Sequence, residues 1–189
     1  MVVLKAPVTA HDHWRGDPDA PVVLVEYGDY QCPYCAAAHS IVKELLDGFH
    51  PSLALVFRHF PLSEAHPLAF PAAQTAEFAG ERDRFWEMHD ALYTNQPRLS
   101  MQTLFNLVEE VGLPRNELQA ALTSGRYAER IRSDFLSGVR GGVNGTPCFF
   151  INGVRHDGAW SFDELAAAIQ TAQMRPPPPT QPPLHGGYR

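Results

Sequence analysis

Residues 22–35 read VVLVEYGDYQCPYC, an apolar run that leads directly into a Cys-x-x-Cys pair. The β-branched and aliphatic residues at its start are typical of a strand buried on both faces, and Gly28 ends the run. Pro33 follows the first cysteine, and proline favours the first position of a helix because it has no N–H to leave unpaired. The stretch therefore predicts a strand followed by a helix, with Cys32 at the helix N-terminus and Cys35 one turn further.

This placement predicts different chemistry for the two thiols. The partial positive charge of a helix N-terminus lowers the pKa of Cys32 below the ordinary value of about 8.5, so we expect Cys32 to be the exposed nucleophile. Residues three apart share a helix face, with Cβ atoms roughly 5–6 Å apart, so the two sulfurs can approach each other. Cys35 is therefore expected to be the resolving thiol, which attacks the sulfur of Cys32 after Cys32 has reacted. This pattern favours redox chemistry at the Cys-x-x-Cys pair. The alternatives are that the pair is half of a zinc site or an inert structural pair. Zinc needs four ligands, and the remaining cysteine, Cys148, has no ligand partner at zinc-site spacing, so we expect no metal.

Composition limits the classes of partner. The chain has 189 residues, a 44% hydrophobic content and a net charge of −6, which are typical of a globular protein. No stretch of lysine and arginine forms a basic stripe, so we expect neither nucleic acid nor an anionic membrane as a partner. No run predicts a signal peptide or a bilayer span, so we expect a cytoplasmic protein that acts on proteins or small thiols. The oligomeric state stays open.

Periodicity along the chain predicts an α/β fold with an inserted helical part. A second strand is expected at 53–60, parallel to the first because a helix joins them. The pair Asn152-Gly153 predicts a hairpin turn between strands at 148–151 and 154–157. The predicted division is an N-terminal loop (1–21), a two-part domain with the strands (22–63 and 139–174), a helical insertion (64–138) and a disordered proline-rich tail (175–189).

The segments GDPDAPVVLVEYGDYQCPYCAAAH, FRHFPL, FWEMHDALY and GTPCFFING resemble the bacterial DsbA-like thiol-disulfide oxidoreductases without a signal peptide. The resemblance implies a thioredoxin-like fold with an inserted α-helical subdomain and no bound cofactor. It implies that Pro147 is a cis proline beside the two cysteines and that Thr146 offers backbone groups to an extended substrate. Pro33 and Tyr34 would then contact the substrate. Partners would be protein thiols and disulfides, with glutathione or a thioredoxin-type protein as electron donor.

Two departures from the family pattern leave the direction of electron flow open. Strong oxidants of the family usually have histidine where this chain has Tyr34, which supplies no cation for the thiolate, so a less oxidising couple is expected. Cys-Pro-Tyr-Cys is also the glutaredoxin pattern, so a glutathione-dependent disulfide reductase is one alternative and a non-catalytic, chaperone-like binding module is another. Cys148 replaces the threonine common after Pro147, and we expect it to be a buried, unpaired thiol.

Several ionisable residues need separate interpretation. Glu26 lies in the apolar strand, six residues before the first cysteine, where an acid is costly unless it is neutral, paired or functional. Thioredoxin-like proteins often have a proton-relaying carboxylate at this spacing, and a structural ion pair is the alternative. The pair His11 and His13 could bind a metal but is expected to be solvated. The remaining histidines that we considered, His39, His59 and His89, are expected to be ordinary structural residues.

Overall fold

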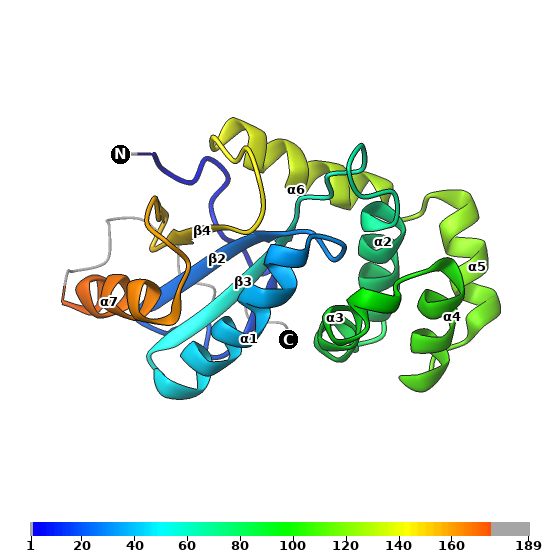
Figure 1. Cartoon of the computed structure of the whole chain (residues 1–189), viewed down its shortest axis with the longest axis horizontal. Coiled ribbons are helices and arrows are strands. Elements are labelled where there is room, and N and C mark those ends of the chain that lie inside the picture. The colour runs from blue at the N-terminus through cyan, green and yellow to red at the C-terminus, as the bar shows by residue number, and fades with distance from the viewer. Residues whose placement is uncertain (1, 175–189) are drawn as a thin grey trace, which may run out of the picture.

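The computed structural model of the chain describes residues 2–174. Its centre is a five-stranded sheet with the order β1-β3-β2-β4-β5 (Figure 1). The strands are β1 His13–Arg15, β2 Val22–Gly28, β3 Leu53–His59, β4 Cys148–Ile151 and β5 Val154–Arg155. The helices are α1 Pro33–Gly48, α2 Ala69–Gly80, α3 Phe85–Thr94, α4 Met101–Glu110, α5 Arg115–Ser124, α6 Ala128–Arg140 and α7 Phe162–Gln173, with a short 3₁₀ helix η1 at Gln96–Arg98.

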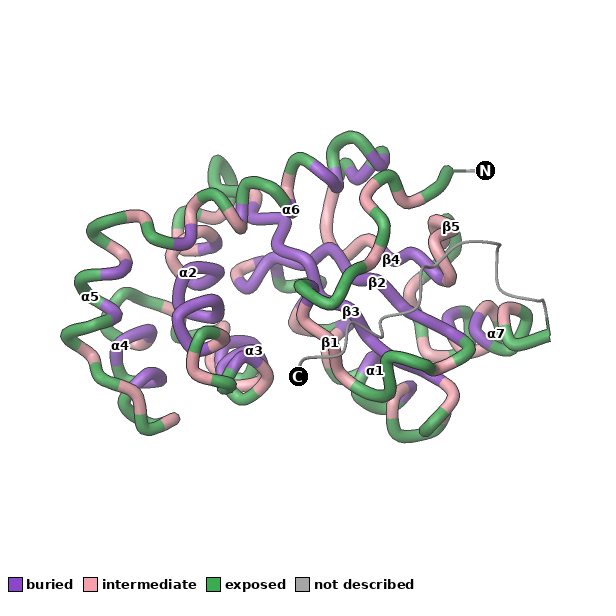
Figure 2. The backbone as a smooth tube through the Cα atoms, turned by 180° about the vertical axis from the view of Figure 1, so that it is seen from behind, coloured by how far each residue is buried: buried purple, intermediate pink, exposed green. Residues whose placement is uncertain are grey.

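Strand β2 is the middle of the sheet, as its apolar sequence predicts. It pairs in parallel with β3 and antiparallel with β4, and both β2 and β3 are buried along their whole length (Figure 2). Val22 and Leu24 face α1 and α7, whereas Val23 and Val25 face the N-terminal segment and α6. Because side chains alternate between the two faces of a strand, a strand covered on both sides must be apolar throughout.

The N-terminal part is more ordered than predicted. Residues 1–21 were expected to be a loop, but β1 lies within this segment and pairs antiparallel with β3, and Val3 forms an isolated bridge with Val154. The buried Arg58 holds the segment down through two hydrogen bonds to Asp12, at 2.8 and 3.1 Å. Tertiary contacts therefore order a stretch whose sequence shows turn residues and too few strand residues to form a recognisable pattern.

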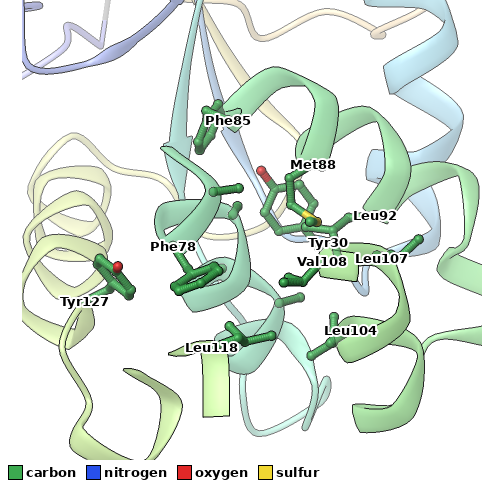
Figure 3. Close-up of a cluster of buried hydrophobic side chains, with 14 of the residues drawn as sticks. Tyr30, Phe78, Phe85, Met88, Leu92, Leu104, Leu107, Val108, Leu118 and Tyr127 are labelled. Atoms are coloured by element: carbon green, nitrogen blue, oxygen red, sulfur yellow. The ribbon is translucent and has the colours of Figure 1, made fainter. Parts of the chain in front are cut away.

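Helices α2 to α6 form the predicted insertion, with one change of boundary. They extend from Ala69 to Arg140, so α6 ends two residues beyond the expected limit at 138. Their inward faces build a hydrophobic cluster of their own, in which Phe78, Leu104 and Leu118 are buried (Figure 3). Tyr30 and both cysteines of the Cys-x-x-Cys pair belong to the same cluster, so the insertion packs directly behind this pair.

The C-terminal elements include the predicted hairpin. Asn152 and Gly153 both have positive φ, at 46° and 77°, as a type I′ turn requires. Strand β5 ends at Arg155, two residues earlier than expected. The proline-rich tail at 175–189 lies outside the described residues. Between residues 2 and 174, none of the helices combines the length and apolar character needed to cross a bilayer.

Candidate active site

The two cysteines lie where β2 passes into α1. Cys32 is the N-cap residue, Pro33 is at the start of the helix, and Cys35 lies in the first turn. All three cysteines of the chain are free thiols. The expectation of an exposed nucleophile was wrong, because Cys32 is only 3% exposed and Cys35 is fully buried. The packing of the helical insertion behind the pair removes most of the surface that an isolated helix N-terminus would offer.

Local hydrogen bonds stabilise the thiolate of Cys32. Its pKa is lowered to about 5, first because the Cys35 side chain donates a hydrogen bond to it. Burial opposes this effect, while Thr146 and the backbone N–H groups of Cys35 and Tyr34 add to it. The predicted contribution of the helix N-terminus is therefore present, but the neighbouring thiol contributes more. No cation is needed for a thiolate at neutral pH.

Cys35 has the opposite electrostatic environment. Burial raises its pKa well above the ordinary value, and the hydrogen bond to Cys32 and, once it is ionised, the carboxylate of Glu26 raise this pKa further. A raised pKa keeps the proton on Cys35 at neutral pH. The site thus holds one thiolate and one thiol, one helical turn apart.

Glu26 lies on β2, close enough to Cys35 to act on the pKa of that thiol. Its neighbours in register are Phe57 on β3 and Phe149 on β4, so neither adjacent strand places a cation opposite it. The residue is 1% exposed, and its Oε1 atom has no hydrogen-bond partner among the described residues. Burial raises the pKa of Glu26 to about 8. This carboxyl group is therefore mainly protonated at pH 7 and can exchange its proton close to neutrality.

The loop before β4 closes the site from the other side. The peptide bond between Thr146 and Pro147 is cis, and Cys32 Sγ lies 3.4 Å from the Thr146 carbonyl oxygen, to which the protonated thiol donates a hydrogen bond. A cavity of about 290 Å³ adjoins this loop and is lined in part by Pro147, Cys148 and Trp160. The site therefore adjoins a concave surface at the loop that contains the cis proline.

The two residues between the cysteines, Pro33 and Tyr34, are exposed, and the third cysteine, Cys148, is partly exposed. Pro33 is exposed, and Tyr34 is 63% exposed with its ring 6.5 Å from the ring of Trp160. Cys148 was expected to be buried, but it is partly exposed, because it lies at the first position of β4 and lines the cavity. Burial nevertheless raises the pKa of this thiol.

Sequence reasoning missed two residues that hold the active-site backbone. Gln96 of η1 donates through Nε2 to the carbonyl oxygens of Tyr30 and Cys32, at 3.0 and 2.8 Å. Asp29 accepts hydrogen bonds from the backbone N–H groups of Gln31 and Leu62, at 2.7 and 2.9 Å. An aspartate two residues before the N–H that it binds is a recognisable turn signal, whereas Gln96 lies 64 residues from its partner Cys32 and has no local signal.

The family described as Thioredoxin matches residues 8–171 of this chain. The chain belongs to the thioredoxin family. Relatives of this thioredoxin-family chain include Na(+)/H(+) antiporter NhaA 1 of Salinispora arenicola, 42% identical over 91% of the chain, and Na(+)/H(+) antiporter NhaA of Nitrosospira multiformis, 38% identical over 88% of it. The chain spans only 26% and 27% of the length of these relatives, about a quarter.

Solved structures agree on the fold. Oxidised BdbD from Bacillus subtilis superposes with a TM-score of 0.81 at 21% identity, covering 91% of this chain and 98% of that one. A thioredoxin-like oxidoreductase from Silicibacter pomeroyi gives 0.75 at 27% identity, with coverages of 87% and 93%. Wolbachia pipientis α-DsbA1 gives 0.76 at 19% identity, with coverages of 90% and 94%. The predicted fold, a thioredoxin-like fold with the helical insertion of DsbA-type proteins, is confirmed.

Proposed function

We propose that this chain is a thiol-disulfide oxidoreductase that exchanges disulfides with protein substrates through Cys32 and Cys35. The observation that carries the proposal is the opposite shift of the two thiol pKa values, with Cys32 at about 5 and Cys35 raised well above its ordinary value. An attacking thiol must be ionised before it reacts, whereas a resolving thiol must keep its proton until its turn comes. Family membership and the DsbA-like structural neighbours support the same activity.

In the reducing direction, the Cys32 thiolate attacks one sulfur of a substrate disulfide. A bond forms between Cys32 and that sulfur, and the other substrate sulfur leaves as a thiolate. Cys35 then loses its proton and attacks Cys32 Sγ, which forms the Cys32–Cys35 disulfide and releases the second substrate sulfur. The substrate disulfide gains two electrons and the enzyme dithiol loses two, so the reverse sequence oxidises a substrate dithiol.

Glu26 is proposed to carry the proton of Cys35. With a pKa of about 8, roughly nine-tenths of this carboxyl group is protonated at pH 7. When a substrate thiolate opens the Cys32–Cys35 disulfide, the protonated Glu26 can give its proton to the departing Cys35 sulfur. In the opposite direction only the ionised tenth can accept that proton. At pH 7 the carboxyl group therefore assists oxidation of substrate thiols more readily than reduction of disulfides.

The substrate is proposed to lie along the loop that contains Pro147. The Thr146 carbonyl is within hydrogen-bond distance of Cys32, and Trp160, which lines the adjoining cavity, has its ring 6.5 Å from the ring of the exposed Tyr34. An extended polypeptide could pair with the Thr146 backbone while its sulfur approaches Cys32. Pro33 and Tyr34 would then contact the neighbouring substrate residues.

Disulfide exchange is tested with insulin as the disulfide substrate and a reduced, unfolded protein as the thiol substrate. We expect the wild type to act on at least one of them, Cys32→Ser to be inactive, and Cys35→Ser to accumulate mixed disulfides through Cys32. If Cys35→Ser traps no more substrate than the double variant, the roles assigned to the thiols are wrong. Glutathione and a thioredoxin-type protein, supplied separately as electron donors, identify the partner that sustains turnover.

A further inference from the structure

Two histidine side chains that the proposed chemistry does not use converge on one carboxylate oxygen. Oε1 of Glu77, on α2, lies 2.7 Å from Nε2 of His13 on β1 and 2.8 Å from Nε2 of His59 on β3. We call these residues the His13–His59–Glu77 cluster. One ligand atom from each residue lies within 4.8 Å of the other two. The cluster joins the N-terminal strand, the central sheet and the helical insertion at one point.

Packing fixes the orientation of these ligand atoms. The His13 ring stacks on Phe85 with ring centroids 3.4 Å apart and an interplanar angle of 6°. The backbone N–H of His59 donates to Asp134 at 3.1 Å, and this histidine side chain is 1% exposed. The His13 side chain is 16% exposed, which leaves a route from solvent. The ligand atoms therefore already point at one another, and to hold a tetrahedral ion they need to separate from 2.7 and 2.8 Å to roughly 3.3 Å.

The carboxylate at the centre of the cluster is nearly buried. Its Oε1 atom is within hydrogen-bond distance of Nε2 of both histidines, and the Glu77 side chain is only 10% exposed. A nearly buried carboxylate requires a positive charge close by. A proton shared with an imidazole can supply this charge, and so can a metal ion that replaces the imidazole protons.

We propose that the His13–His59–Glu77 cluster binds one divalent cation of the zinc class and thereby ties the helical insertion to the sheet. Two imidazole nitrogens and one carboxylate oxygen are ligands that Zn²⁺ accepts, with a fourth position left for water. Two nitrogen ligands disfavour Mg²⁺ and Ca²⁺, which prefer oxygen. No thiol belongs to the cluster, so this site is separate from the Cys32–Cys35 chemistry.

A second group of two histidines and one acid is a weaker candidate for a metal site than the His13–His59–Glu77 cluster. His39, His89 and Asp90 also lie within ligand distance of one another. However, Asp90 is already paired through both oxygens with Arg15, at 3.0 and 2.8 Å, and Lys43 lies 3.8 Å away. Two cations at this carboxylate oppose a divalent ion there. His39 therefore provides a matched control.

The side chain of Arg130 opposes cation binding at the proposed site, so removing its charge should increase the affinity for the metal. Arg130 Nε lies 3.7 Å from Glu77 Oε1, and its Nη1 lies 3.4 Å from Asp134. The positive charge of Arg130 repels a cation at Glu77. Arg130→Gln, which keeps hydrogen-bonding groups and removes the charge, should therefore tighten metal binding severalfold. A role of the cluster as a hydrogen-bonded contact alone predicts no such gain.

The experiment is a titration of the chelator-treated full chain with Zn²⁺, in a Cys32→Ser/Cys35→Ser background so that these thiols cannot bind the metal. Calorimetry should give one ion per chain, and the melting temperature should rise when the ion is present. His13→Gln and Glu77→Gln should each weaken binding at least tenfold, whereas His11→Gln and His39→Gln should leave it unchanged. Co²⁺ should give a spectrum without a thiolate charge-transfer band.

Three results of this titration would overturn the proposed metal site. Absence of stoichiometric binding would overturn the proposal, as would binding that survives both His13→Gln and Glu77→Gln or that is lost with His39→Gln. Since His13 lies on an edge strand and keeps some exposure, its replacement is the variant best placed to fold. Circular dichroism of each metal-free variant identifies any that has lost structure, and Arg130→Gln provides the independent gain of affinity.

Discussion

Replacing Glu26 with glutamine should change how the stability of the oxidised protein depends on pH. The carboxyl pKa is raised from 4.5 in an exposed group to about 8 in the folded chain, because the group is buried. Between these two values the folded state holds a proton that the unfolded state has lost. The free energy of unfolding therefore falls as pH rises through this window.

The size of the effect follows from the two pKa values. Each pH unit within the window costs about 1.4 kcal/mol, and allowing for the rounded ends gives a loss of roughly 2.5 kcal/mol between pH 5 and pH 7. Glutamine at position 26 has nearly the same shape as the protonated acid and does not titrate. Glu26→Gln should therefore match the wild type below about pH 4, exceed its stability by about 0.8 kcal/mol at pH 5, and exceed it by about 3.3 kcal/mol at pH 7.

The measurement needs the oxidised protein, because in the reduced protein Cys32 changes the stability with pH in the opposite direction to Glu26. Its pKa falls from 9.0 to about 5 on folding, so the unfolded state binds more protons and stability rises with pH across this range. In the reduced wild type the contributions of Cys32 and Glu26 should largely cancel between pH 5 and pH 8. Oxidation removes the thiolate, so that the difference in slope between the wild type and Glu26→Gln then reports on Glu26.

Urea unfolding followed by circular dichroism, repeated at each pH unit from 5 to 8, measures these slopes. Glu44→Gln removes an exposed carboxyl from α1 and controls for the loss of one negative charge. If the curves of oxidised wild type and Glu26→Gln stay parallel across the range, Glu26 does not have a raised pKa, and its proposed role as the proton carrier for Cys35 fails with it.

Three further outcomes are expected. The ultraviolet absorbance of the reduced protein should show a thiolate titrating near pH 5 that Cys32→Ser lacks, and a midpoint near 9 would contradict the stabilisation described for this thiol. Cys148 should react with iodoacetamide at pH 7 much more slowly than Cys32, with Cys148→Ser retaining exchange activity, because burial raises its pKa; equal labelling rates would refute this. Gln96→Ala should lower the exchange rate severalfold in a folded protein, because it removes the two hydrogen bonds that hold the Tyr30 and Cys32 carbonyls. Gln102→Ala on α4 should not, and equal effects of the two changes would leave Gln96 without a positioning role.

Local signals in the sequence were sufficient to predict the elements that carry the Cys32–Cys35 pair. The apolar run at 22–25, the helix-starting Pro33 and the Asn152-Gly153 turn are short-range patterns, and each is found where predicted. Such patterns work because backbone dihedral preferences and side-chain alternation act over a few residues. The resemblance of separate segments to a known family supplied their assembly, and the fold agrees with it.

Some local predictions were wrong where distant packing decides the result. Residues 13–15 contain no recognisable strand pattern, yet β3 offers an edge with which they pair. Cys32 was expected to be exposed, but it packs against the helical insertion and is only 3% exposed. In both cases the segment alone lacks the information, because burial and edge pairing depend on what another part of the chain places beside it.

The sequence by itself determined that a strand leads into a helix with a Cys-x-x-Cys pair at its start, and it singled out Glu26 as an unusual acid. Only the tertiary structure decided that phenylalanines on both adjacent strands leave this acid without a cation, which raises its pKa. Only the tertiary structure brought His13 to Glu77, 64 residues away, and His59 to the same oxygen. The physical reason is that electrostatic interactions and metal-ligand geometry depend on distances in space, and these are set by packing between elements that lie far apart along the chain.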